Sequence, residues 1–136
     1  MGFDQYHEPP DELPAQTRTF ARMCASLTEE AEAIGWYEQR IAIESDREAV
    51  AVMRNAQGEE FKHFAMDLEY LLRKKPLWRE IARGILFQEG DIVSRGEVSE
   101  EEAGEESLES VDVPGVAAPL EAPISLGIGG LKGAVR

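Results

Sequence analysis

The chain of 136 residues has only one cysteine, Cys24, and few basic residues. A single cysteine cannot form an intrachain disulfide or supply a cysteine-based metal cluster within one chain. There are 14 lysine and arginine residues against 27 aspartate and glutamate residues, so the formal net charge is −13. Because nucleic-acid binding needs a positive surface, this charge argues against a nucleic-acid partner.

Long apolar runs are also missing from the sequence. No stretch approaches the ~20 apolar residues needed to span a bilayer. The first ten residues have neither the basic nor the apolar region of a signal peptide. We therefore expect no membrane partner and a reducing, cytoplasmic setting.

Composition divides the chain into four segments. Residues 1–10 read as an extended N-terminal arm. Residues 11–90 contain little glycine, have apolar residues at steps of three and four, and form a helical domain. Residues 91–123 are rich in Glu, Gly, Ser and Pro with few aromatics, which predicts an acidic, flexible linker. Residues 124–136 form a terminal peptide.

The helical domain predicts two long helices and one short helix. The first covers 11–43. The second covers 45–75 and begins with a capping box formed by Ser45 and Glu48. The third covers 77–87 and follows a proline, which cannot continue the preceding helix.

The expected fold class is all-α, an antiparallel two-helix hairpin followed by a short C-terminal helix. A lone hairpin cannot cover both of its apolar faces. A second copy of the chain would cover them by forming a four-helix bundle across a homodimer interface.

Each long helix carries charged residues within an otherwise apolar stripe. The stripes are Phe20, Met23, Leu27, Glu30, Ile34, Tyr37, Ile41 and Ala49, Met53, Ala56, Glu60, His63, Asp67, Tyr70. If the chain reverses near Ser45, Glu30 and Glu60 both lie roughly 22 Å from the turn. Burying unpaired carboxylates is costly unless a cation compensates, and a metal pair is the simplest compensation.

The i, i+3 spacing of Glu60 and His63 places both side chains on one helix face. In ferritin-like di-iron proteins, two helices each supply a Glu and two others each supply Glu-x-x-His. This chain has one of each, so a complete iron site has to form between two chains. Two other interpretations stay open. Glu-x-x-His arises by chance in Glu-rich helices, and the buried Glu and His could satisfy each other in a non-enzymatic helical adaptor.

Several neighbouring residues have two interpretations each. Asp67 could orient the His63 imidazole, or it could have a solvated or capping role. Glu29 and Glu32 could attract Fe²⁺ or could belong to a solvated helix face. Tyr37 continues the buried stripe, where it packs or hydrogen-bonds a ligand.

Part of the sequence resembles the encapsulated ferritin family, the half-ferritins packaged inside encapsulin shells. The resemblance rests on His7-Glu8-Pro9, on the block from Glu29 to Arg40 that includes Trp36-Tyr37, on Glu59-Glu60-Phe61-Lys62-His63, and on Met66, Leu68 to Arg73 and Leu86-Phe87. It covers roughly residues 7 to 90.

The resemblance implies a ferroxidase that oxidises Fe(II) to Fe(III) and delivers iron for mineral storage inside the shell. It places iron ligands at Glu30, Glu60 and His63, nearby aromatic residues at Trp36 and Tyr37, and secondary metal sites, with calcium or zinc as further ions, at Glu29 and Glu32. The di-iron centre would lie at a dimer interface. The family assembles into a ring-shaped decamer, a pentamer of dimers.

The end of the chain resembles the encapsulin cargo-loading peptide. Residues 125–133 read Ser-Leu-Gly-Ile-Gly-Gly-Leu-Lys-Gly, with Gly130 where serine is usual. Leu126, Ile128 and Leu131 are the apolar anchors expected to bind the encapsulin shell protein. This would place the protein in the cytoplasm, inside the encapsulin nanocompartment.

Overall fold

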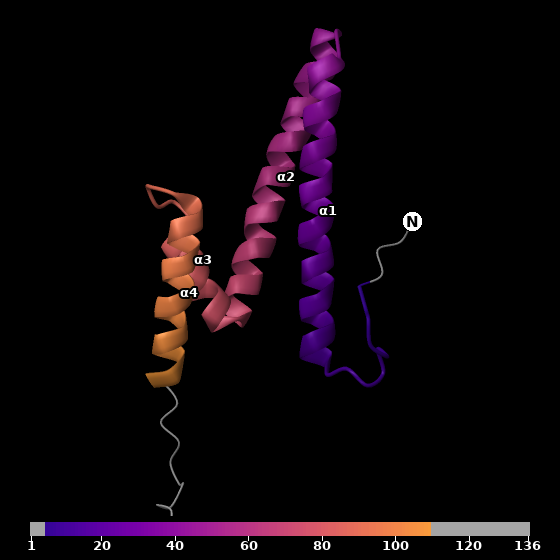
Figure 1. The fold of residues 1–136 in the computed structure, drawn as a ribbon. Helices are drawn as coiled ribbons and strands as arrows, with labels where there is room; N and C mark the ends of the chain where they lie inside the picture. The colour runs from indigo at the N-terminus through magenta and orange to yellow at the C-terminus, as the bar shows by residue number, and fades with distance from the viewer. Residues whose placement is uncertain (1–4, 110–136) are drawn as a thin grey trace, which may run out of the picture.

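The computed structural model describes residues 5–109, and this part of the chain is all-α. Helices α1 (Ala15–Ile43) and α2 (Arg47–Lys74) form an antiparallel hairpin, α3 (Pro76–Ile85) turns away from its open end, and α4 (Ile92–Glu109) packs against α3 (Figure 1). The expected helical fold class with its two-helix hairpin is confirmed. No helix in the described part is long and apolar enough to cross a membrane.

Helix α1 begins four residues later than expected, so the predicted start near Asp11 is wrong. Pro14 is the residue before the first helical turn, and a residue that precedes proline is disfavoured in the helical conformation. The preceding residues form turns instead, in which the N–H of Glu12 donates to the carbonyl of Pro9 at 3.0 Å. Arg18 fastens this segment to α1 by donating to the carbonyl of Pro10 at 3.0 Å.

The residue that caps α2 is Asp46, so the predicted capping box of Ser45 and Glu48 is wrong. The Asp46 carboxylate accepts from the N–H groups of Glu48 and Ala49 at 2.8 and 3.0 Å. The Glu44 carboxylate accepts from the N–H groups of Ser45 and Asp46, both at 2.8 Å. The carboxylates of Glu44 and Asp46 therefore accept from four backbone N–H groups, two in the connection between the helices and two in the first turn of α2.

The hairpin has a thin core and one buried polar contact. Gln57 is 8% exposed, and its amide donates to the carbonyl of Ile34 at 3.3 Å and to the Glu38 carboxylate at 3.0 Å. By contrast, Val52 and Met66 on α2 are 65% and 62% exposed. Apolar surface of this extent is what an incomplete bundle leaves uncovered. Dimerisation through it stays a prediction.

Helix α4 lies where the sequence predicts a flexible linker, so that expectation is wrong for residues 92–109. Glutamate is a good helix former, which accounts for helix in an acidic segment. Ser99 and Ala103 are buried against α3, and a Cβ at Gly84 would lie 1.9 Å from the Ser99 hydroxyl. Glycine is thus required where the two helices approach. The rest of the linker and the terminal peptide 124–136 lie outside the described residues.

The start of α4 is held by Asp91. Its carboxylate accepts from the N–H and from the hydroxyl of Ser94, both at 2.9 Å. These hydrogen bonds hold the pKa of Asp91 below its usual range. The capping by Asp91 and the close contact at Gly84 fix α4 beside α3.

We predict that Asp46→Ala lowers the free energy of unfolding by about 1 kcal/mol, because two N–H groups at the start of α2 lose their acceptor. Urea denaturation followed by circular dichroism measures the change. Ser45→Ala is the matched control, since Ser45 uses its N–H and not its hydroxyl in the turn. An equal loss in the control would show that the turn, not the Asp46 cap, is what matters.

Candidate metal centre

The hairpin brings Glu30 of α1 together with Glu60 and His63 of α2. One ligand atom from each residue lies within 4.8 Å of the other two. His63 Nδ1 lies 3.2 Å from Glu60 Oε2 and 3.9 Å from Glu30 Oε2. In residues 5–109 this is the group of acidic and histidine side chains that could hold a metal ion.

The carboxyls of Glu30 and Glu60 shift each other's pKa. A hydrogen bond to Glu60 raises the pKa of Glu30, and the burial of its side chain and the charge of Glu60 add to the rise. The same hydrogen bond lowers the pKa of Glu60, as does its contact with His63. The two facing carboxyls therefore favour a positive charge placed between them.

The site lies at one edge of the α1–α2 contact and is partly open. The side chains of Glu30 and Glu60 are 24% and 22% exposed, and that of His63 is 45% exposed. The sequence predicts buried stripes, so a single chain covers these residues less than expected. Their open side leaves room for ligands from another molecule.

The other predicted residues surround this group without joining it. Glu29 and Glu32 are exposed on α1, and Trp36 is 53% exposed. Tyr37 is partly buried, with the Arg40 guanidinium 5.5 Å from its ring centre. Asp67 acts on the site through its charge, which contributes to the raised pKa of Glu30. Leu126, Ile128 and Leu131 lie outside the described residues.

The sequence analysis missed the contact between Gln57 and Glu38, which joins the helices beside the site. Gln57 is one turn before Glu60, so its bonds to α1 fix the height of Glu60 against Glu30. Gln57, Phe64 and Leu71 are spaced by seven residues. This spacing could have predicted that Gln57 faces α1.

Residues 5–89 match the family model described as EncFtn-like. The chain belongs to the EncFtn-like family. It is 42% identical over 101 residues to a "Ferritin-like protein" of Thermotoga maritima, covering 74% of this chain and 86% of the relative. It is 36% identical over 129 residues to an "Encapsulated ferritin-like protein" of Rhodospirillum rubrum, covering 93% of this chain and 87% of the relative.

A solved structure shows the same fold. The chain is similar to a crystal structure of a protein from Nitrosomonas europaea, with a TM-score of 0.64 and 37% sequence identity. The match covers 65% of this chain and 98% of the other. The match to the EncFtn-like family model thus covers the whole hairpin that carries Glu30, Glu60 and His63.

The donor atoms suit iron better than softer metals. Two carboxylates and one imidazole are hard or intermediate ligands of the kind found in di-iron carboxylate proteins. Cys24 is not part of this group, so no thiolate favours zinc or copper(I) here. Carboxylate oxygens that lie within 4.8 Å of each other also favour a cation between them.

We predict that Glu30→Gln raises the melting temperature of the metal-free protein and abolishes the further rise caused by Fe²⁺ under anaerobic conditions. The neutral amide removes the repulsion between the two carboxyls but also removes a ligand. Differential scanning fluorimetry with and without Fe²⁺ gives both values. Glu59→Gln is the control, since Glu59 pairs with Lys62 on the exposed side. A Glu30→Gln protein still stabilised by Fe²⁺ would contradict the assignment of Glu30 as a ligand.

Proposed function

We propose that this protein is a ferroxidase that oxidises Fe²⁺ to Fe³⁺ at a di-iron site completed by a second copy of the chain. The observation that carries the proposal is the meeting of Glu30 with the Glu60–His63 pair within 4.8 Å. One Glu and one Glu-x-x-His on facing helices are half of the ligand set of ferritin-like di-iron proteins. The "Encapsulated ferritin-like protein" among its relatives supports an iron-related function.

The exposure of the three side chains supports a site shared by two chains. In a single chain, carboxylates at 22% and 24% exposure and an imidazole at 45% exposure would leave a bound ion in contact with water on one side. A second hairpin placed against this side would add the same three ligands. It would also cover apolar residues such as Val52 and Met66, which are exposed on α2.

In the proposed reaction Fe²⁺ is the substrate, and dioxygen accepts one electron from each Fe²⁺ ion. Glu30 and Glu60 bind the cations through carboxylate oxygens, which have to be deprotonated to act as ligands. His63 binds through Nδ1, the nitrogen that faces both carboxylates. Glu29 and Glu32, exposed on α1, contribute secondary sites that attract cations.

We further propose that residues 124–136 attach the protein to an encapsulin shell, as the sequence of that peptide suggests. Leu126, Ile128 and Leu131 would fill apolar positions in a shell groove, and the glycines between them permit an extended backbone. The preceding residues would act as a tether. Fe³⁺ leaving the site would then be stored inside the shell.

A second candidate function is a helical adaptor without enzymatic activity. The observation in its favour is the contact of His63 Nδ1 with Glu60 Oε2 at 3.2 Å, by which the two side chains satisfy each other without metal. The adaptor predicts that Fe²⁺ changes neither stability nor assembly.

We predict a fast phase of Fe²⁺ oxidation that saturates at about one iron per chain, because two chains share one pair. Anaerobic loading of the purified oligomer, followed by mixing with oxygen and absorbance detection of Fe³⁺, measures it. Glu60→Ala should abolish the fast phase, whereas Glu59→Ala should retain it. Saturation at about two irons per chain would mean that each chain holds a whole site. Absence of a fast phase in the unmodified protein would favour the adaptor.

We predict that deletion of residues 125–136 abolishes loading into encapsulin shells and leaves the oxidation rate unchanged. Co-expression with a shell protein, followed by purification of the shells and measurement of cargo content, tests the first part. Leu126→Ser/Leu131→Ser is a milder variant that keeps the length of the peptide. Undiminished loading of the deletion variant would show that another segment contacts the shell.

A further inference from the structure

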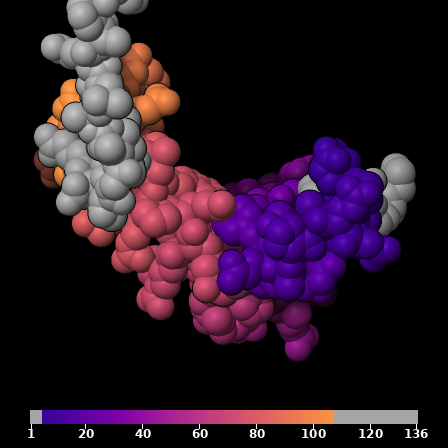
Figure 2. All heavy atoms as spheres, turned by 90° about the horizontal axis from the view of Figure 1, so that it is seen from below, coloured from indigo at the N-terminus to yellow at the C-terminus, as the bar shows by residue number. Residues whose placement is uncertain are grey.

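Among the described helices, α1 has α2 as its only neighbour. Helix α2 also contacts α3, and α4 packs on α3 alone. Figure 2, seen from below, likewise shows α4 apart from α1. In a bundle folded from one chain, further helices would limit how far the first two can slide past each other. Here the turn and the contacts within the hairpin have to fix the alignment of α2 along α1.

Gln57 is the buried residue of the hairpin between the candidate metal centre and the turn. Within residues 31–59, all of which the structure describes, it is the one residue that is buried. Apolar contacts are not directional, and the same face of a helix recurs after about 5.4 Å. Apolar contacts alone would therefore tolerate more than one alignment of the two helices.

The amide of Gln57 selects one of these alignments. It donates to the carbonyl of Ile34 at 3.3 Å and to the Glu38 carboxylate at 3.0 Å, so it binds both the backbone and a side chain of α1. A hydrogen bond needs a defined distance and direction, and a buried amide that loses its partners is unfavourable. Ile34 lies one turn after Glu30, and Gln57 lies one turn before Glu60. The contact is thus adjacent to the place where the two carboxyls meet.

The length of one alignment step shows what this contact does for the candidate metal centre. A slide by one helical turn moves α2 by about 5.4 Å along α1. One ligand atom from each of Glu30, Glu60 and His63 lies within 4.8 Å of the other two. The slide is larger than the whole spread of these atoms, so it would separate the ligand on α1 from the two ligands on α2.

We infer that Gln57 is a positioning residue, whose amide locks α2 against α1 in the alignment that brings Glu30 to Glu60 and His63. It supplies no ligand atom and acts through the alignment of the helices. Its effect on metal affinity rests on the proposed function, whereas its effect on the alignment does not.

A charge-adding substitution separates positioning from simple electrostatics. Gln57→Glu keeps the size of the side chain but replaces the donor with a carboxylate that faces Glu38. Charge alone predicts that a carboxylate added near the site strengthens cation binding. We expect Gln57→Glu to weaken Co²⁺ binding by roughly tenfold or more, as is typical when a residue that orients metal ligands is lost. Gln57→Leu, which adds no charge, should weaken it too. Titration of the full-length chain followed by visible absorbance measures the affinity, and circular dichroism checks that the helices remain.

Gln39→Glu is the matched control for this substitution. The Gln39 amide donates within α1, to the carbonyl of Gly35 at 3.1 Å, so the same charge is added without breaking a link between the helices. The control should bind Co²⁺ at least as tightly as the unmodified protein. A Gln57→Glu protein that binds as tightly as the control would overturn the inference. Absence of Co²⁺ binding by the unmodified protein would instead overturn the proposed function, and the alignment is then decided by the next measurement.

Spin labels measure the alignment without any metal. Cysteines that replace Glu32 on α1 and Arg73 on α2, both exposed and at different distances from the turn, carry the labels in a Cys24→Ser background. Labelled full-length chains are diluted with unlabelled chains, so that the distance within one chain is measured by electron–electron double resonance. We expect both Gln57 variants to shift or broaden this distance by up to about 5 Å, one helical turn, and Gln39→Glu to leave it unchanged. An unchanged distance distribution in both Gln57 variants would overturn the inference.

Discussion

The central constraint in this molecule is that two carboxyls, Glu30 and Glu60, face each other across the hairpin. The tight turn around Asp46 fixes the register of α1 against α2, and Gln57 secures it one turn before Glu60. The proximity of the two carboxyls raises the pKa of Glu30. A cation between the carboxyls would relieve the same repulsion, which is why we propose a metal there.

The incomplete burial of this pair is one reason to propose that a second chain completes the candidate metal site. Deeply buried carboxylates would cost several kcal/mol in a single chain, whereas here water reaches them on one side. Val52 and Met66 on α2 expose apolar surface to water, and its burial would be favourable. A second hairpin would satisfy both needs at once. Ligand completion and burial of apolar surface therefore favour the same partner, a copy of this chain.

The sequence alone predicts the hairpin and the three clustered residues, because both depend on regular helical spacing. Prediction from the sequence fails where a single residue decides at which position a helix begins or which side chain caps it. Asp46 and Ser45 are both good caps, and only the geometry of the turn shows that Asp46 is used. Proline is tolerated in a first turn, yet Pro14 delays α1. For α4 the acidic composition suggested disorder, but the close contact of Gly84 with Ser99 stabilises a helix against α3. Contacts between distant residues of this kind leave no periodic signal.

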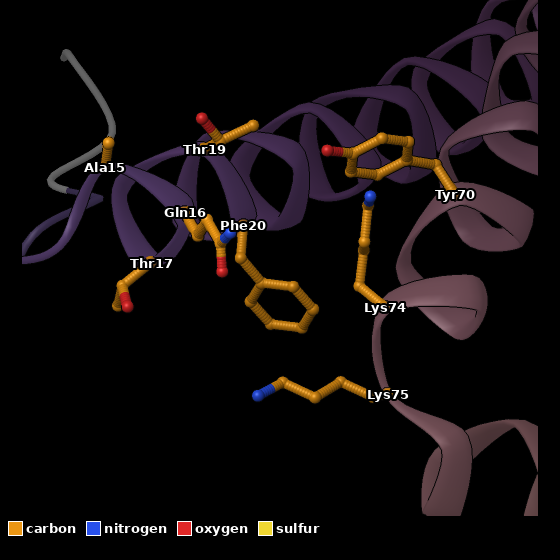
Figure 3. Close-up of a pocket in the computed structure, with 8 residues that line it drawn as sticks. All are labelled: Ala15, Gln16, Thr17, Thr19, Phe20, Tyr70, Lys74 and Lys75. Carbon is orange, nitrogen blue, oxygen red and sulfur yellow. The ribbon is translucent and has the colours of Figure 1, made fainter.

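The shortage of positive charge limits how copies of this chain can meet. With a net charge of −13, two copies repel each other, so a stable contact must bury apolar surface and use cations. Many described basic side chains already have partners within their own chain: Lys62, Arg73, Arg79 and Arg83 bind carboxylates, and Arg18 and Arg95 bind carbonyls. Lys74 and Lys75 instead lie over the aromatic rings of Tyr70 and Phe20, between the end of α2 and the start of α1 (Figure 3). Cations beside apolar surface are the combination that a contact between two acidic chains requires.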